Sequence, residues 1–333
     1  MSSVTPEAQD LAQLVKGVLQ RDPASLGRAI TLIESEAPKK RAQAEALLRE
    51  LLQHPGKSDR IGITGVPGVG KSTFIDALGT HLTAQGHRVA VLAVDPTSPV
   101  TGGSILGDKT RMGRLAQDPN AFIRPSPSSG TLGGVAARTR ESMQICEAAG
   151  FDVLLIETVG VGQSEVVARE MVDFFLVLML AGAGDELQGI KRGILELADM
   201  IAINKADGDN KSNAERARNE YASALHYMQR SESGWTPDAV CVSALEGTGL
   251  AELWESISEH QDKLRASGSL ETKRSKQRAS WMWQEVQERL RRSFDQDEGV
   301  RGIADKLEGE VRSGSKLPSQ AAQELLAAFL GRQ

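Results

Sequence analysis

The eight residues from Gly65 to Ser72 carry the strongest chemical signal in the sequence, because they match GxxxxGK[ST] at every fixed position. Glycines let a loop curl so that successive backbone N–H groups point at phosphate oxygens, and a helix that starts there adds its positive dipole end. Lys71 would bridge the β- and γ-phosphates of a nucleotide, and the Ser72 hydroxyl would bind Mg²⁺. The pattern predicts a loop that holds a nucleoside triphosphate.

The segments on either side of this loop strengthen the prediction. A short apolar run, Arg60–Thr64, precedes the loop, and a helical stretch, Ser72–Gln85, follows it, which is the strand–loop–helix context that the motif requires. A glycine-rich turn without a ligand is the alternative. The predicted phosphate-binding residues are Gly65, Val66, Pro67, Gly68, Val69, Gly70, Lys71, Ser72 and Thr73.

A second motif selects the base. Asn204-Lys205-Ala206-Asp207 ends another apolar run, Asp199–Ile203, and resembles the NKxD motif in which the Asp carboxylate accepts hydrogen bonds from guanine. Adenine presents the wrong donors there, and a carboxylate left without donors would cost about 1–3 kcal/mol. After the next apolar run, the backbone amides of Ser243, Ala244 and Leu245 would contact the guanine oxygen, as in related GTPases. By itself, NKAD is also compatible with a surface turn.

A third set of residues lies between these motifs. Glu157-Thr158-Val159-Gly160 follows the apolar run Phe151–Ile156 and resembles the DxxG motif, with Glu in place of Asp. Gly160 would meet the γ-phosphate, and Glu157 would approach Mg²⁺ through water. Asp95 ends another apolar run and is a candidate second carboxylate for the metal. Asp108, on a glycine-rich loop, is a further candidate, with a helix-capping or solvated position as its alternative.

The elements that must position these residues follow from the pattern of apolar runs. Near-continuous apolarity indicates strands buried on both faces, as in a parallel sheet covered by helices. The sequence therefore predicts a doubly wound, mostly parallel α/β domain, with a helical extension at each end. The expected strands are Arg60–Thr64, Arg88–Val94, Phe151–Ile156, Asp173–Leu180, Asp199–Ile203 and Ala239–Val242.

Three segments are expected along the 333 residues: an N-terminal helical extension (1–56), the nucleotide-binding domain (57–266) and a C-terminal helical arm (267–333). Residues 273–278 are rich in Lys and Arg and are expected to be a solvated linker, with partner binding as the alternative. Beyond them, Trp283, Val286, Leu290 and Phe294 form one helical stripe, which could pack on its own domain or bury a subunit interface.

Composition excludes several classes of function. The net charge of −5 provides no global attraction for nucleic acid or an anionic membrane, and the apolar runs are too short to cross a bilayer. Two cysteines, Cys146 and Cys241, support no disulfide framework and are expected to be packed thiols. The first residues resemble no secretory signal, so a cytoplasmic location is expected. The absence of His- or Cys-rich metal motifs argues against a metallochaperone.

Taken together, the phosphate loop, VDPTSP, GGSILGDKTRM, IETVGVGQSE, NKAD and SAL resemble the MeaB/ArgK family, the methylmalonyl-CoA mutase-associated GTPases of the SIMIBI class. The resemblance spans roughly residues 10–330. It implies a GTPase that binds GTP or GDP with Mg²⁺, carries no covalently attached cofactor, and acts as a chaperone of adenosylcobalamin-dependent methylmalonyl-CoA mutase. Such a chaperone gates cofactor loading and protects the mutase from inactivation. The resemblance also favours a homodimer formed through the C-terminal arm.

The source of catalytic power is less evident. Ras-like GTPases orient the attacking water with a Gln directly after DxxG, whereas Val161 follows Gly160 here. We therefore expect slow intrinsic turnover that rises when a partner orders the switch segments. The loop after Leu180 resembles the family's third switch, and Gln188 or Lys191 could complete the site when it closes. Lys191 could equally be an exposed cation in the first turn of a helix.

Two other functions compete with a GTPase chaperone. One is a P-loop kinase acting on a small molecule, the activity behind an older label of some relatives, lysine/arginine/ornithine transport kinase. NKAD argues against it, because such kinases generally prefer adenine. The other is a nucleotide-dependent switch without significant turnover.

Overall fold

The computed structural model describes residues 6–35, 37–94, 112–124, 132–158, 164–182, 192–228 and 234–331. Their strands form one all-parallel sheet in the order β3-β2-β4-β1-β5-β6-β7. The strands are β1 (Asp59–Gly65), β2 (Val89–Val94), β3 (Ala121–Arg124), β4 (Val153–Thr158), β5 (Phe174–Leu180), β6 (Met200–Asn204) and β7 (Asp238–Cys241). β2 and β3 lie on one side of β1, with β4 between β1 and β2, and β5, β6 and β7 follow on the other side. This change of direction in the strand order confirms the doubly wound α/β fold.

Six of the strands match the expected apolar runs to within two residues at each end, and β3 was not predicted. Its four residues are all only half-buried, and it lies at one edge of the sheet beside β2. A short edge strand lacks the continuous apolarity by which the inner strands are recognised.

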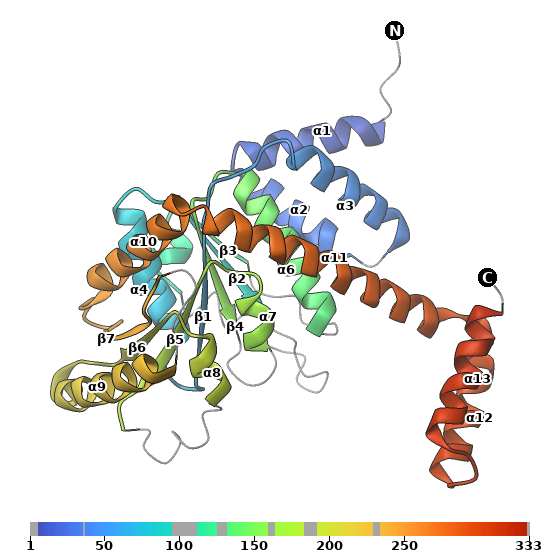
Figure 1. Ribbon diagram of the computed structural model, residues 1–333. Coiled ribbons are helices and arrows are strands. Elements are labelled where there is room, and N and C mark those ends of the chain that lie inside the picture. Colours follow the sequence, from blue (N-terminus) through green and yellow to red (C-terminus); the bar gives the residue numbers. More distant parts are fainter. Residues whose placement is uncertain are drawn as a thin grey trace. The chain divides into compact units, whose positions relative to one another are not determined.

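Helices connect the strands and cover both faces of the sheet. Helices α4 and α10 pack on one face, and α6, α7 and α8 lie on the other, with α9 against β6 and β7 (Figure 1). The helices are α1 (Pro6–Leu19), α2 (Pro23–Glu34), α3 (Pro38–Leu51), α4 (Lys71–Ala84), α6 (Leu132–Ala148), α7 (Ser164–Arg169), α8 (Arg192–Leu197), α9 (Lys211–Met228), α10 (Leu250–Ala266), α11 (Ser269–Gln296), α12 (Glu298–Arg312) and α13 (Pro318–Leu330), with 3₁₀ turns at Leu115–Gln117 and Gly208–Asn210.

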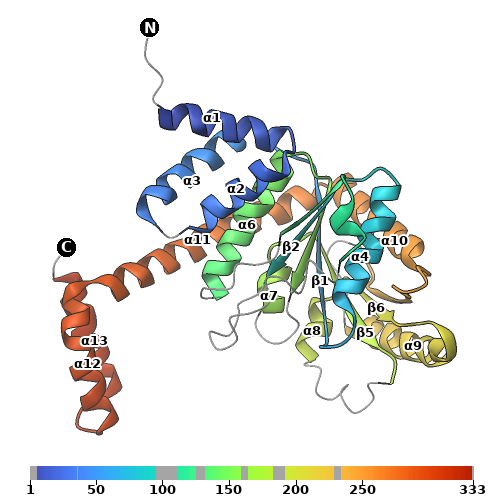
Figure 2. The same cartoon turned by 180° about the vertical axis from the view of Figure 1, so that it is seen from behind.

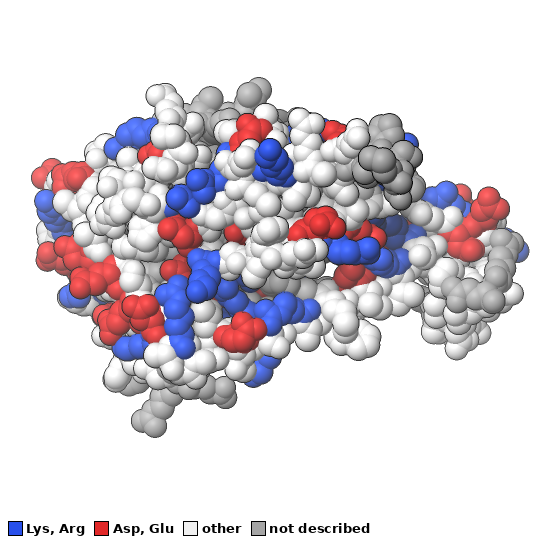
Figure 3. Space-filling view, turned by 90° about the horizontal axis from the view of Figure 1, so that it is seen from above, with Lys and Arg blue, Asp and Glu red and all other residues white. Residues whose placement is uncertain are grey.

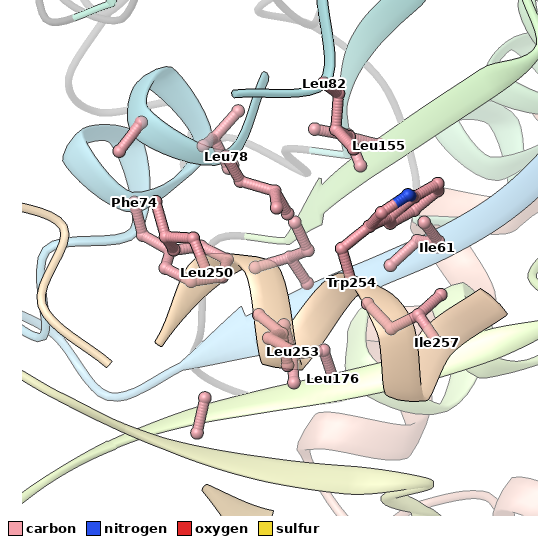
Figure 4. Close-up of a cluster of buried hydrophobic side chains, with 14 of the residues drawn as sticks. Ile61, Phe74, Leu78, Leu82, Leu155, Leu176, Leu250, Leu253, Trp254 and Ile257 are labelled. Atoms are coloured by element: carbon pink, nitrogen blue, oxygen red, sulfur yellow. The ribbon is translucent and has the colours of Figure 1, made fainter. Parts of the chain in front are cut away.

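The main core fills the space between the sheet and the pair α4 and α10 (Figure 4). Phe74 and Leu78 of α4 meet Leu253 and Ile257 of α10 over the strands, and all four are fully buried. Burial of each such side chain stabilises the fold by about 1.5–3 kcal/mol. This packing fixes α4, and therefore the start of that helix at Lys71.

The first three helices form a layer of their own on the other side of the sheet. Each of α1, α2 and α3 contacts α6, and α2 lies alongside it (Figure 2). Leu26, Ile30 and Leu47 are fully buried there. Pro23 and Pro38 each occupy the first turn of a helix, where the missing N–H costs nothing, so the prolines begin these helices.

The expected linker at residues 273–278 is wrong, because this segment is part of helix α11. The expected solvation holds for Ser275, Lys276 and Arg278, which are exposed, but not for Lys273 and Arg274. Lys273 Nζ donates to the Asp173 carbonyl at 2.6 Å, and Arg274 pairs with the Asp173 carboxylate at 2.6 Å. Gln277 donates to the Val172 carbonyl at 3.0 Å. The start of α11 is thus fixed to the beginning of β5.

The chain divides into two compact units, residues 1–277 and 278–333. In the second unit, α12 and α13 pack together, and Phe294 meets Phe329 with ring centroids 5.5 Å apart. Trp283 and Leu290 on α11 are 62% and 56% exposed.

The surface face drawn in Figure 3 carries charges of both signs, as the small net charge of the sequence leads one to expect. Figure 3 shows Lys and Arg side chains lying among Asp and Glu side chains, so the face in view is not of one sign. In the described part of the chain, no helix combines the length and apolarity that crossing a membrane requires. Cys146 is buried in α6, and burial raises the pKa of its thiol, which agrees with a packed rather than a reactive cysteine.

Candidate nucleotide-binding site

The predicted phosphate loop links the end of β1 to the start of α4. Gly68 and Gly70 have φ values of +77° and +91°, a region that L side chains rarely adopt. At Gly65 the limit is space, because a Cβ there would lie 2.5 Å from the carbonyl oxygen of Leu178. Val69 is buried and anchors the loop to the core, whereas Pro67 and Gly68 are exposed at its tip. The two glycines that the motif fixes are therefore required for different reasons: Gly65 by lack of space for a Cβ, and Gly70 by its backbone conformation.

Lys71 lies inside the curl of this loop. Its Nζ donates a hydrogen bond to the Gly65 carbonyl at 2.9 Å. Burial lowers the pKa of Lys71, and the negative charges of Glu157 and Glu165 partly oppose that shift. The hydrogen bond of the Lys71 ammonium is therefore with the loop backbone, and the two acids act on it through their charge.

The base-reading motif touches the phosphate loop directly. Asn204 ends β6, is 1% exposed, and donates from its side-chain amide to the Val69 carbonyl at 2.8 Å. The exposed Lys205 donates to the Gly68 carbonyl at 2.9 Å. Two consecutive residues of NKAD are therefore hydrogen-bonded to the carbonyls of two consecutive loop residues, and the two motifs share one site.

The predicted guanine contacts lie beside this junction. The Ser243 hydroxyl donates to Asp207 Oδ2 at 2.5 Å, and the Ala244 amide donates to Asn204 Oδ1 at 3.4 Å. Asp207 is half-buried, so its carboxylate is held in place but accessible. Leu245 is 81% exposed. The segment after β7 thus positions Asp207 through Ser243.

Glu157 and Thr158 end β4, the neighbour of β1 in the sheet. Glu157 is 9% exposed, and its Oε1 lies 3.5 Å from the Ser72 hydroxyl. Behind it, the Thr158 hydroxyl donates to Thr64 at 2.7 Å in the buried interior. This contact ties the end of β4 to the end of β1, and so sets the distance between Glu157 and the loop.

The donors present suit Mg²⁺. The metal prefers oxygen ligands and is usually held by one or two carboxylates together with substrate phosphates. Ser72 and Glu157 supply a hydroxyl and a carboxylate that already face one another. No group of three His, Cys, Asp or Glu side chains that could hold a metal occurs among the described residues. A metal here would therefore depend on a bound nucleotide for further ligands.

Five predicted site residues lie outside the described part of the chain. They are Asp95, Asp108, Gly160, Gln188 and Lys191. Their predicted roles remain expectations. In the sequence, Asp95 directly follows β2, and Gly160 is the second residue after β4.

Sequence reasoning missed one buried acid, Glu165 in α7. An acidic residue in the first turn of a helix is typical of an exposed position that complements the helix dipole, so the sequence gives no reason to single it out. In the structure Glu165 is 1% exposed and close enough to act on the charge of Lys71. Only the packing of α7 against β1 and β4 reveals it.

Together, these groups can bind the phosphates of a nucleotide and form hydrogen bonds with its purine base. The loop contributes its backbone amides and the Lys71 ammonium. The Ser72 hydroxyl and the Glu157 carboxylate can hold a cation beside it, and the half-buried Asp207 carboxylate can accept hydrogen bonds. These are the groups that binding a purine nucleotide with a divalent cation requires.

Comparison with known proteins agrees with this geometry. Residues 26–298 match the family model described as methylmalonyl Co-A mutase-associated GTPase MeaB. A probable GTPase of Mycobacterium tuberculosis is 54% identical over 316 residues, which cover 95% of this chain and 93% of the relative. A mouse protein, the mitochondrial methylmalonic aciduria type A homolog, is 46% identical over 336 residues, which cover 98% of this chain and 81% of the relative.

A solved structure extends the comparison to the fold. The crystal structure of a protein named LAO/AO transport system kinase superposes with a TM-score of 0.76 at 38% sequence identity. The match covers 97% of this chain and 98% of that one. The likeness therefore includes the helical segments at both ends as well as the sheet.

Proposed function

The chain belongs to the family of methylmalonyl-CoA mutase-associated GTPases, and from that premise we propose that it binds Mg²⁺·GTP at the site formed by the phosphate loop and NKAD. It hydrolyses the nucleotide to GDP and phosphate. One observation carries the proposal: Asn204 and Lys205 are hydrogen-bonded to the carbonyls of Val69 and Gly68. A ligand held by the loop therefore has the base-reading residues at its other end.

Each group has a role that its chemistry supports. The loop amides and Lys71 bind the phosphates, and Asp207 accepts from the guanine ring while Ser243 holds it in position. Ser72 and Glu157 would hold Mg²⁺, with Asp95 and Asp108 as further candidates. When bound, the metal neutralises negative charge on the phosphate oxygens. Gly160 would meet the γ-phosphate.

This proposal includes slow GTP hydrolysis by the isolated protein. Phosphoryl transfer depends mainly on positioning and charge stabilisation, and the residue directly after Gly160 is Val161 rather than a water-orienting Gln. Gln188 and Lys191 would complete the site when a partner orders their loop. Multiple-turnover assays with and without that partner measure the effect, and fast hydrolysis by the isolated chain would contradict it.

The partner we propose is an adenosylcobalamin-dependent methylmalonyl-CoA mutase, for which the chain acts as a GTP-dependent chaperone. The support is the description of the family and the name of the mouse relative, which refers to methylmalonic aciduria. Co-purification with the mutase of its own host tests this, since a chain that never associates with the mutase in any nucleotide state cannot gate its cofactor.

We further propose that residues 267–333 form a dimerisation arm, with residues 1–56 and 57–266 as the other two segments. The exposed apolar residues Trp283 and Leu290 support this, because large apolar side chains on a long helix favour a protein partner. A second copy of the chain is the proposed occupant. Sedimentation of the full chain would show a dimer, and Trp283→Ser should shift it towards monomer.

The decisive test of the nucleotide site is competition between GTP and ATP for the full-length protein. GTP should compete far better than ATP.

Lys71→Ala should weaken nucleotide binding and abolish hydrolysis. Lys57 is an exposed lysine before β1, so Lys57→Ala should change neither quantity. Asp207→Asn should shift preference from guanosine to xanthosine nucleotides, because the xanthine 2-oxo group needs a donor where guanine needs an acceptor.

The same competition between GTP and ATP distinguishes a GTPase from the second candidate function, a small-molecule kinase. A protein named a transport system kinase has the same fold at 38% identity, so phosphate transfer to a small molecule is the second candidate. A kinase of that kind would prefer ATP and would not respond to Asp207→Asn. Equal hydrolysis of both nucleotides would count against the GTPase proposal.

A further inference from the structure

Helices α1 and α6 end in the same way but with different residues at the key position. Each ends in a Schellman motif, in which one residue takes the left-handed backbone conformation. After α6 this residue is Gly150, with φ +83°, and after α1 it is Arg21, with φ +59°. In the part of the chain that the structure describes, Lys205 of NKAD is the one other non-glycine residue with a positive φ. Glycine takes this conformation without steric cost, whereas an arginine does not, so Arg21 holds its position against a local backbone preference.

The side chain of Arg21 reaches the glycine that ends the other helix. A Cβ built on Gly150 would lie 3.6 Å from a guanidinium nitrogen of Arg21 and 3.8 Å from one of Arg88, the residue before β2. Both arginines are exposed, and Gly150 is half-buried. Because Gly150 has no side chain, the place where the two guanidinium groups meet is open to solvent.

The two guanidinium groups have no hydrogen bond or ion pair with any described residue. The acids next to them in the sequence and in the sheet are already engaged. Asp152 accepts from the Arg88 backbone amide at 2.8 Å and lies 3.4 Å from the His87 ring, and Asp22 accepts from the Ser25 amide at 2.8 Å. The carboxyl end of α6 offers only about half a negative charge. Two positive charges therefore converge at a place that does not neutralise them.

The backbone fixes the point from which each side chain extends. The Arg88 carbonyl accepts from the amides of Asp152 and Val153 at 3.0 and 3.1 Å, which ties this residue to the start of β4. The Arg21 amide donates to the Val18 carbonyl at 2.9 Å within the motif that ends α1. The convergence thus follows from two firmly held segments.

This place is separate from the proposed nucleotide site. Val89 and Val153, the first residues of β2 and β4, are neighbours in the sheet, so Arg88 and Gly150 lie at the edge where the strands begin. The phosphate loop follows the end of β1, at the opposite edge. A six-residue strand spans about 20 Å. A nucleotide held by the loop therefore does not place its phosphates between these arginines.

We propose that Arg21 and Arg88 form a second anion site, over Gly150, that binds a phosphate group of another ligand. Guanidinium groups present paired N–H donors that suit phosphate oxygens. A phosphate monoester carries about two negative charges near neutral pH, which matches the two arginines, and its oxygens can accept from both at once. A carboxylate carries a single charge and matches the pair less well.

The test is binding of inorganic phosphate to the full-length protein in excess Mg²⁺ and GDP, which occupy the proposed nucleotide site. Phosphorus NMR follows the broadening of the inorganic phosphate signal at constant ionic strength, and a titration gives the dissociation constant. Wild-type protein should bind with a dissociation constant on the order of 1 mM. Removal of either guanidinium group should weaken binding about fivefold or more, because each supplies charge-assisted hydrogen bonds.

Arg21→Gly is the most informative variant, because it removes the guanidinium group and supplies the residue that the left-handed conformation favours. It should weaken phosphate binding and yet unfold at no lower a temperature than wild type, so misfolding cannot explain the loss. Arg88→Gln should weaken binding to a similar extent, and Arg88→Lys, which keeps the charge without the paired donors, should lie between. Arg216→Gln, at an exposed arginine of α9, is the control and should bind as wild type does.

The outcomes are distinct from those that test the GTPase proposal, which does not involve these residues. A wild-type protein that leaves the phosphate signal unchanged overturns the inference. Binding that survives both Arg21→Gly and Arg88→Gln also overturns it, because the anion is then held elsewhere. Acetate that displaces phosphate at equal concentration would contradict the preference for a dianion. Glycerol phosphate distinguishes the source: equal or tighter binding than inorganic phosphate supports an ester as the ligand, and weaker binding supports the free ion.

Discussion

The side-chain amide of Asn204 donates a hydrogen bond to the backbone carbonyl of Val69 at 2.8 Å, which joins the end of β6 to the middle of the phosphate loop. The two residues are 135 positions apart in the sequence. Because Asn204 also accepts from the Ala244 amide at 3.4 Å, one buried side chain connects all three nucleotide-binding segments. The geometry of the site therefore depends on a residue whose role is to position the others.

Asn204→Ala should both destabilise the protein and weaken nucleotide binding. The substitution leaves the Val69 carbonyl without its donor, and loss of such a partner in the interior costs about 1–3 kcal/mol. Urea unfolding measures the first effect and calorimetric titration with GDP the second. Asn219→Ala, on the exposed side of α9, is the control and should change neither quantity. Normal GDP affinity in Asn204→Ala would show that the loop keeps its shape without this contact.

Arg274→Ala should lower the free energy of unfolding by about 3–5 kcal/mol, because it leaves a buried carboxylate without its cation. Asp173 is completely buried, and Arg274 binds it through two side-chain nitrogens at 2.6 and 3.0 Å. Arg274→Lys should restore only part of the loss, since an ammonium cannot reproduce the paired geometry. The measurement is urea denaturation of the full chain.

A double variant checks the cause of that loss. Asp173→Asn removes the charge that Arg274 compensates, so adding it to Arg274→Ala should recover stability relative to the single variant. Additive losses would mean that the two residues act independently. The Arg60 amide, which also donates to Asp173 at 3.0 Å, remains available in both variants.

The same pair of residues shows where sequence reasoning ends. Residues 273–278 have the composition of a solvated segment, and nothing local indicates otherwise. The partners of Arg274 are Asp173, 101 residues away, and the Ser58 carbonyl, 216 residues away. A charge cluster becomes a buried contact only when the fold brings such partners to it, so composition alone predicted the wrong environment.

The phosphate loop and the inner strands were predictable for the opposite reason. The glycines at 68 and 70 are required by local backbone conformation, and the buried strands carry continuous apolar residues whatever their neighbours are. Ala121–Arg124 has neither kind of local signal. Glu165 escaped prediction because its burial results from the packing of α7, whereas its sequence position is typical of an exposed helix start.

His260 should make the stability of the protein fall as the pH decreases from 7 to 5. It lies edge-on to Phe174 and Trp235, with ring centroids 5.0 Å away in each case. Burial lowers the pKa of His260 from 6.5 to about 4. The unfolded chain therefore binds a proton that the folded protein rejects, and the contribution of His260, complete above about pH 6.5, falls by about 2 kcal/mol by pH 5.

The measurement must separate His260 from an acid that titrates in the opposite sense. Burial raises the pKa of Asp59 from 3.8 to about 6, so its contribution to stability decreases as the pH rises through that interval. Urea unfolding of wild type and His260→Gln at several pH values cancels Asp59 in the difference. That difference should shrink towards pH 5, and a constant difference would contradict the neutral buried imidazole.

Ser243→Ala should weaken guanine binding without changing which base is preferred. The Ser243 hydroxyl donates to Asp207 Oδ2 at 2.5 Å and accepts from the Glu246 amide at 3.1 Å, so it fixes the carboxylate that reads the ring. Loss of one such bond should lower GDP affinity about fivefold to tenfold, because hydrogen bonds to charged groups contribute about 1.5 kcal/mol or somewhat less when the site is partly solvated.

Calorimetric titration with GDP and with xanthosine diphosphate measures both affinities. The ratio should stay in favour of GDP, in contrast to Asp207→Asn, since the accepting carboxylate is still present. A variant that binds the xanthosine nucleotide better would mean that Ser243 itself reads the base, and that Asp207 is its support.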